Sequence, residues 1–161
     1  REVWRLGVDR WVAAIGGWHA AARRGRPVCV VDVGTATTID LVDADGRHRG
    51  GVIVPGPELM VASLLRGTRG IQSRARGDRP RVARVPFARS TREALEAGAA
   101  HAVAALVERA CADARRLTGA RPLVLLTGGA AGSVAPLVAT PHSVMPDLVL
   151  RGLAALDPAL P

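Results

Sequence analysis

The feature that most constrains this fold is an apolar run, VCVVDV, at residues 28–33. It is apolar at every position except Asp32, which predicts a strand covered on both faces. The next segment, residues 36–43, alternates between apolar and polar side chains and predicts a second strand. The tetrapeptide DADG at residues 43–46 predicts a tight hairpin turn, and residues 47–56 return as a third strand. The sheet is therefore expected to begin with a three-stranded meander.

The rest of the sequence predicts helices around this meander and two further strands. Residues 1–10 are expected to form a short strand or a loop. Helices are predicted over residues 11–24, 58–67, 90–118, from 133 and 147–156, and strands over residues 122–129 and 142–145. Ser90 and Glu93 form a capping-box pattern at the start of the longest helix, and Gly119 ends it. Gly98 inside this helix predicts a close helix contact, within the chain or between subunits. The order indicates a mixed α/β sheet with helices packed on it.

The composition supports a packed core and argues against nucleic acid as a partner. Of the 161 residues, 48% are hydrophobic and only 2% are aromatic, so Val, Leu, Ile and Ala must fill the core. The formal charge is +8, carried by arginines with no lysine. These arginines are scattered and few aromatics could stack on bases, which makes a nucleic-acid partner an unfavoured interpretation. The Arg-rich stretch 66–92 predicts a solvated loop; the alternative is that some of its arginines meet an anionic ligand.

The cysteines and histidines do not form a metal-binding pattern. Cys29 and Cys111 lie in apolar surroundings without CxxC spacing, which predicts free, buried thiols in a reducing compartment. The four histidines form no ligand cluster. No apolar run reaches membrane-spanning length and no signal peptide is evident, so a cytoplasmic protein without membrane contact is expected.

The residues that follow the first strand form a candidate phosphate site. A strand that turns directly into an antiparallel partner leaves backbone N–H groups pointing away from the sheet end. Gly34 lacks the Cβ that would keep a phosphate from this backbone, and Thr35 adds a hydroxyl donor. Asp32 could hold a cation or orient a water near the phosphates. The alternative is that Asp32 only caps the turn and Gly34 only permits it.

Six sequence blocks in order resemble one family closely. They are LGVDRW at 6–11, VVDVGTATTIDLVD at 30–43, GGVIVPG at 50–56, STREALEAGAA at 90–100, LLTGGAA at 125–131 and PDLVLRGLA at 146–154. The turn pattern is similar to the phosphate-binding strand pair of the acetate kinase, sugar kinase, Hsp70 and actin superfamily. The six blocks together resemble type III pantothenate kinase. This resemblance implies a ribonuclease H-like lobe of that superfamily.

The resemblance also implies an activity, ligands and partners. The implied reaction is phosphorylation of pantothenate to 4'-phosphopantothenate with Mg-ATP, the first step of coenzyme A biosynthesis, by a cytoplasmic homodimer. Asp9 would accept the proton of the substrate hydroxyl, Asp32 would bind potassium or ammonium, and Gly34 and Thr35 would contact ATP. The pantothenate contacts implied are Gly7, Val8, Asp9, Arg10 and Thr91.

Each of these implied roles has a structural alternative. Arg10 could form a plain surface ion pair, and Thr91 could simply follow the Ser90 cap. Gly128 and Gly129, implied to lie near the adenosine, could serve only a strand-to-helix turn. The functional interpretation requires that Asp9 and Asp32 share one cleft.

The sequence also departs from the family pattern. Members begin with a lobe that carries an Asp-x-Gly-Asn-Thr motif, which is not found here. We therefore expect residues 1–26 to be the end of a first lobe plus a linking helix, residues 27–161 to be the second lobe, and the chain alone to be weakly active or inactive. Two other functions stay open: a non-catalytic regulator of the Bvg accessory factor type, and a phosphate-binding module with another substrate. The Gly-Val-Asp-Arg block at 7–10 argues against the module.

Overall fold

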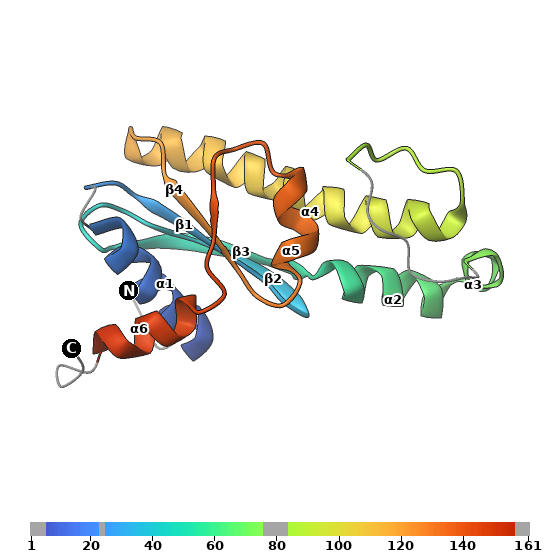
Figure 1. Cartoon of the computed structure of the whole chain (residues 1–161), viewed down its shortest axis with the longest axis horizontal. Coiled ribbons are helices and arrows are strands. Elements are labelled where there is room, and N and C mark those ends of the chain that lie inside the picture. The colour runs from blue at the N-terminus through green and yellow to red at the C-terminus, as the bar shows by residue number, and fades with distance from the viewer. Residues whose placement is uncertain (1–5, 23–24, 76–83, 157–161) are drawn as a thin grey trace.

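The computed structural model describes residues 6–22, 25–75 and 84–156 (Figure 1). The elements in chain order are α1 (Val8–Ala22), β1 (Val28–Val33), β2 (Ala36–Val42), β3 (His48–Pro55), α2 (Pro57–Gly67), α3 (Arg69–Arg74), α4 (Thr91–Thr118), β4 (Leu123–Thr127), α5 (Ala131–Val134) with a 3-10 turn (Ala135–Leu137), β5 (Ser143–Val144) and α6 (Leu148–Leu156).

The five strands form one mixed sheet in the order β3-β2-β1-β4-β5. The first three strands pair antiparallel, as the hairpin signal predicts, while β4 and β5 run parallel to β1. This order confirms the predicted α/β class and the ribonuclease H-like lobe. Because β1 and β4 are parallel neighbours, the residues that follow both strands meet at one end of the sheet. The residues that precede them meet at the other end.

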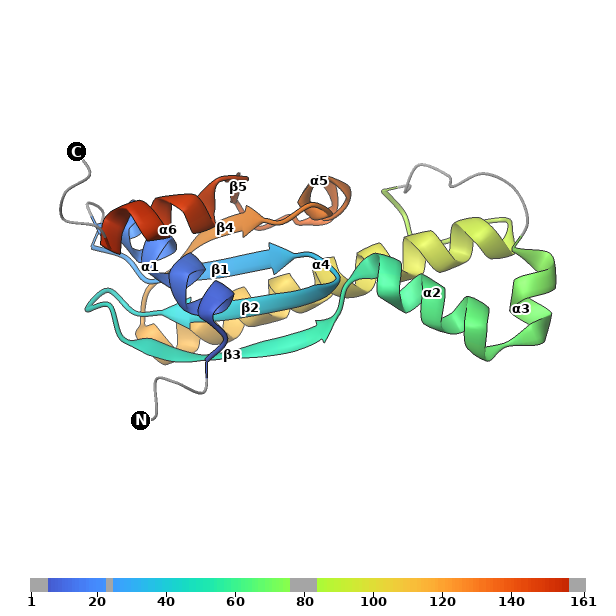
Figure 2. The same ribbon diagram turned by 90° about the horizontal axis from the view of Figure 1, so that it is seen from below.

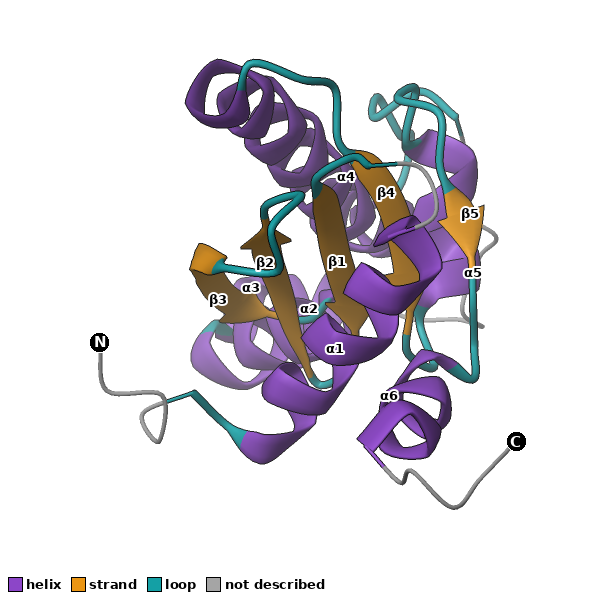
Figure 3. Cartoon of the chain, turned by 90° about the vertical axis from the view of Figure 1, so that its left-hand side faces the viewer, coloured by secondary structure: helices purple, strands orange, loops and turns teal. Residues whose placement is uncertain are grey.

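Helices cover both faces of this sheet, and each face has its own apolar core (Figure 3). One core lies under α4 and contains both cysteines, which are buried and free, as predicted. The other lies under α1 and α6 and includes Val28, Val30 and Leu148. The strand β1 supplies side chains to both cores, which explains its unbroken apolar pattern. Beyond the end of β3, α2 and α3 pack beside the first half of α4 (Figure 2).

The helices α1 and α6 lie against each other through two glycines. A Cβ on Gly152 would lie 2.0 Å from the Val12 carbonyl oxygen, and one on Gly16 would lie 2.4 Å from the Leu148 carbonyl oxygen. Real side chains do not approach backbone this closely. The glycines therefore set the separation of the two helices.

We expect Gly152→Ala to lower the free energy of unfolding by about 1–3 kcal/mol, because α6 must shift away from α1. Gly98→Ala is the matched control, since a Cβ at Gly98 in α4 meets no atom within 4 Å. That variant should gain roughly 0.5–1 kcal/mol from the better helix propensity of alanine. Urea unfolding of both variants measures the difference. Equal stability of the two would contradict this account of the α1–α6 contact.

Three local expectations are wrong in detail. Helix α1 begins at Val8, three residues earlier than predicted, so residues 8–10 are helical rather than strand or loop. The Arg-rich stretch contains the short helix α3, while its residues 76–83 lie outside the described part of the chain, as do residues 1–5 and 23–24. At the start of α4 the Ser90 hydroxyl accepts from the Glu93 N–H, but the Glu93 carboxylate accepts from the Arg89 N–H and not from Ser90.

Candidate active site

The predicted phosphate-binding turn lies where β1 ends and β2 begins. Asp32 pairs with Thr38 across the β1–β2 ladder, and the N–H of Gly34 donates to the Ala36 carbonyl. Among the described residues, no backbone carbonyl accepts a hydrogen bond from the Thr35 N–H. Thr35 itself is exposed. One N–H and one hydroxyl donor thus lie at the carboxyl end of β1, and donors of this kind can bind an anion.

Two further chain segments close around this turn. A Cβ on Gly56, just after β3, would lie 1.9 Å from the Gly34 carbonyl oxygen. A Cβ on Gly128, just after β4, would lie 2.3 Å from Asp32 Oδ1. Gly128 also has φ +93°, which favours glycine. The Gly128–Gly129 turn therefore abuts the Asp32 carboxylate, which brings three strand ends to one place.

Asp9 lies near enough to Asp32 to act on its ionisation. Burial raises the pKa of the Asp32 carboxyl, and the negative charge of Asp9 raises it further. Asp9 is exposed and stands in the first turn of α1, next to Gly7, where a Cβ would lie 2.7 Å from Asp9 Oδ1. The two carboxylates thus belong to one region of the molecule rather than to opposite sides.

The raised pKa of Asp32 predicts a pH-dependent cost to stability. In the folded chain the pKa lies above its ordinary 3.8, so folding takes up a proton, and stability falls as pH rises from about 3.8 through the folded pKa. We expect Asp32→Asn to melt at a higher temperature than the parent chain at neutral pH. The difference should shrink as the pH falls through the folded pKa towards 3.8, and it should be absent below about 3.8. Melting curves at several pH values test this, and a constant difference would rule out the titration of Asp32 as its cause.

Arg10 is held in a buried ion-pair cluster on the α1 face of the sheet. Its Nε and Nη2 donate to the two carboxylate oxygens of Asp40 at 2.9 and 2.6 Å, and His48 Nε2 lies 2.7 Å from Asp40 Oδ1. Asp40 is only 1% exposed. Gly51 pairs with Asp40, and a Cβ there would lie 2.4 Å from Asp40 Oδ1. The alternative that Arg10 forms only a plain surface ion pair is therefore wrong. The pair is buried, and it anchors the first turn of α1 to β2.

Sequence reasoning missed Asp40, His48 and Gly51 as members of this cluster. One signal was available: Asp40 is a charged residue within an otherwise apolar and threonine-rich strand, opposite a Gly-Gly pair. Asp40 and Arg10 are 30 residues apart, so only the strand register and the placement of α1 reveal their pairing.

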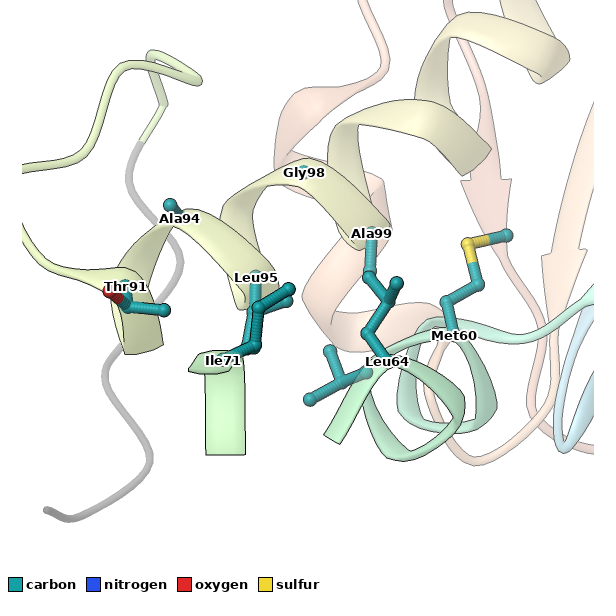
Figure 4. Close-up of a pocket in the computed structure, with 9 residues that line it drawn as sticks. Met60, Leu64, Ile71, Thr91, Ala94, Leu95, Gly98 and Ala99 are labelled. Carbon is teal, nitrogen blue, oxygen red and sulfur yellow. The ribbon is translucent and has the colours of Figure 1, made fainter. Parts of the chain in front are cut away.

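Thr91 lies in a different place from the other predicted site residues. It lines a cavity of about 420 Å³ between α2, α3 and α4, with Met60, Leu64, Ile71 and Leu95 among its apolar neighbours (Figure 4). The lining contains none of the other predicted site residues. Within one chain, therefore, the structure brings Asp32, Gly34 and Thr35 together at the carboxyl end of β1, with Asp9 close enough to raise the pKa of Asp32, and leaves Thr91 in a separate cavity.

The site offers few ligands for a metal ion. In the described part of the chain, no group of three His, Cys, Asp or Glu side chains could hold a metal. Asp32 makes no hydrogen bond or ion pair with any described residue, so its carboxylate oxygens are available to a weakly held cation. An ion with an incomplete protein shell fits this donor set better than a structural metal does. No described helix is both long and apolar enough to cross a membrane.

The mixed five-stranded sheet with helices on both faces gives the chain a ribonuclease H-like, actin-like fold. Residues 1–113 match the sequence profile of type III pantothenate kinase. The chain belongs to the type III pantothenate kinase family.

Individual relatives agree with this assignment. The chain is 39% identical over 154 residues to the type III pantothenate kinase of Paracidovorax citrulli, covering 94% of this chain and 58% of the relative. It is 43% identical over 155 residues to that of an Azoarcus species, covering 96% and 55%. The chain thus spans little more than half the length of these relatives.

One solved structure shares the fold. It is described as a Baf family transcriptional activator from Campylobacter jejuni and superposes with a TM-score of 0.67 at 22% identity, covering 95% of this chain and 64% of the other. At this identity the likeness concerns the fold alone.

Proposed function

We propose that this chain is the second lobe of a pantothenate kinase and that it carries the catalytic site. The kinase transfers the γ-phosphoryl group of Mg-ATP to the primary hydroxyl of pantothenate. This reaction takes place in the cytoplasm and leads towards coenzyme A. The observation that carries the proposal is the neighbourhood of Asp9 and Asp32 beside the Gly34–Thr35 turn. The family membership and the identities of 39% and 43% to the two relatives described above support it.

The proposed roles follow from the chemistry of phosphoryl transfer. Asp9 is exposed and stands on a helix that the Arg10–Asp40 pair fixes, so it can accept the proton of a bound alcohol. Phosphoryl transfer mainly needs an aligned nucleophile and donors for the phosphate oxygens. The Thr35 N–H and hydroxyl would supply such donors. Asp32 would hold a monovalent cation, potassium or ammonium, and the bound charge would lower its raised pKa.

Arg10 has a narrower proposed role than a free guanidinium would have. Its Nε and one Nη2 hydrogen point at Asp40, so the Nη1 edge is the part that could meet the pantothenate carboxylate. Gly7 and Val8 precede it on the exposed start of α1 and would contact the same substrate.

A homodimer would reconcile the position of Thr91 with a substrate contact. Thr91 lines an apolar cavity apart from Asp9, with exposed Leu64 beside it. In the proposed dimer, a second copy would bring its Thr91 to the Asp9 site. The proposed division at residue 26 belongs to the same hypothesis, with residues 1–26 joining this lobe to a first one.

The test of this proposal uses the full-length protein as the cell makes it. The assay couples ADP formation to NADH oxidation, with pantothenate and ATP present and potassium compared with sodium. We expect ADP formation that requires pantothenate and increases with potassium. Absence of pantothenate-dependent turnover, together with specific DNA binding, would favour a regulator of the Bvg accessory factor type. Turnover only with another alcohol would identify a kinase of different specificity.

A further inference from the structure

A second pocket lies at the end of the sheet opposite the proposed kinase site. The parallel strands β1, β4 and β5 begin at this end, which faces the viewer in Figure 3. The segments that precede them therefore meet, although they are far apart in sequence. They line a pocket of about 310 Å³ formed by Arg26, Arg121, Pro122, Leu123, Pro141, His142 and Ser143.

The chemistry of the lining is cationic. Its charged residues are Arg26 and Arg121, and Ser143 and His142 also line it. The lining contains no carboxylate. Among the described residues, no acidic side chain pairs with Arg26 or Arg121. A pocket lined by two arginines, with no carboxylate in its lining, favours a bound anion.

One of the two arginines is held rigidly in place. Arg26 donates from Nε and Nη2 to the Arg121 carbonyl at 3.1 and 2.9 Å, and from Nη2 to the Pro122 carbonyl at 3.3 Å. Its Nη1 group makes none of these hydrogen bonds. The bonds fasten the start of β1 to the start of β4 and fix the guanidinium before any ligand arrives. Such preorganisation lowers the entropic cost of binding.

The opposite wall is also fixed. His142 Nδ1 lies 2.8 Å from the Thr140 carbonyl, so Nδ1 carries the hydrogen and Nε2 is left for other partners. Glu108 of α4 accepts from the N–H and hydroxyl of Thr140. Burial raises the pKa of Glu108, but the Thr140 hydrogen bonds outweigh burial, and the nearby His142 lowers the pKa further. The Glu108 carboxylate thus forms its hydrogen bonds with Thr140 behind the pocket, and the Thr140 carbonyl in turn holds His142.

We propose that this pocket binds a small, multiply charged oxyanion, through Arg26 Nη1, the Arg121 guanidinium and the Ser143 hydroxyl. The site is separate from the Gly34–Thr35 turn, because it stands at the amino ends of the strands whose carboxyl ends carry that turn. It does not depend on the proposed kinase activity. Phosphorylated metabolites and tricarboxylates share the required charge, and the experiment distinguishes them.

The test is an NMR titration of the chain with inorganic pyrophosphate and, in parallel, with citrate. We expect saturable shifts of the Leu123 and Ser143 amides with pyrophosphate and weaker ones with citrate; the reverse order would assign the pocket to carboxylates. Arg121→Gln should weaken this binding by about tenfold, since one charge-assisted contact is lost. Arg121 suits the test because, unlike Arg26, its side chain does not fasten β1 to β4. The control is Arg66→Gln, an exposed arginine at the end of α2.

Four outcomes would overturn the proposal. Three of them are an absence of shifts at Leu123 and Ser143 at millimolar concentrations of both probes, equal affinity in the parent chain and Arg121→Gln, and an equal loss in Arg66→Gln. Shifts confined to Gly34 and Thr35 would also overturn it, while supporting the phosphate-binding turn. Thermal melting of Arg121→Gln checks that the variant is folded.

Discussion

If the proposed kinase function is right, replacing Asp9 by asparagine is expected to reduce the turnover of the full-length protein by about a hundred- to ten-thousand-fold, the usual contribution of a positioned general base. Asparagine keeps the size of the side chain and can still accept a hydrogen bond, but it cannot take up the hydroxyl proton at neutral pH. Asp9 is exposed and forms no core contact, so the variant should fold normally. The coupled assay gives the rate, and melting curves give the stability.

The control for this variant is Asp45→Asn. Asp45 is also an exposed aspartate, and it lies in the β2–β3 turn at the other end of the sheet from the Gly34–Thr35 turn. It should change neither rate nor stability. If Asp9→Asn retained the parent rate, Asp9 would lose its assigned role.

A second readout of Asp9→Asn does not require activity. Since the Asp9 charge contributes to the raised pKa of Asp32, its removal should move that pKa toward the ordinary 3.8, leaving the part caused by burial. Carboxyl carbon NMR of the labelled chain measures the change. An unaltered Asp32 pKa would show that the two carboxylates do not share a cleft, whatever the rate does.

The sequence predicts most of the scaffold because its local signals agree with one another. The strand at residues 28–33 is apolar on both faces, and both faces are covered. The turn at residues 43–46 and the helix between Ser90 and Gly119 carry strong local signals, and each forms where it is predicted. The fold class follows from the order of these elements.

Features that depend on tertiary contacts escape prediction. No Ser, Thr, Asp or Asn precedes Val8 to predict a helix start there, and Arg10 in the first turn of α1 is fixed by Asp40 from a distant strand. Helix α3 stands in an arginine-rich stretch without an apolar face and packs against α2 and α4. The neighbourhood of Asp9 and Asp32 was expected only through the family resemblance, because no spacing rule joins a helix start to a strand end 23 residues later. The separation of Thr91 from that site had no sequence signal at all.

The largest predicted change in the free energy of unfolding concerns the Arg10–Asp40 pair. Asp40→Asn removes the negative charge from a side chain that is 2% exposed and leaves Arg10, 15% exposed, without its partner. Breaking a buried ion pair on one side typically costs about 3–5 kcal/mol, more than the pair itself contributes, because the remaining charge stays desolvated. We therefore expect Asp40→Asn to lower the free energy of unfolding by about 3 kcal/mol. Urea unfolding measures this loss.

The double variant Arg10→Gln/Asp40→Asn distinguishes two costs: the loss of the ion pair itself and the burial of an unpaired Arg10 charge. It should recover a large part of the loss, because neither buried charge remains. The surface control is Asp113→Asn on α4, whose partners Arg109 and Arg116 are exposed and screened by water, so its effect should be small. Asp40→Asn should also loosen the first turn of α1 and so shift the pKa of Asp32 through the displaced Asp9. A double variant no more stable than Asp40→Asn would mean that Asp40 acts through His48 or through packing, and that Arg10 does not anchor the helix.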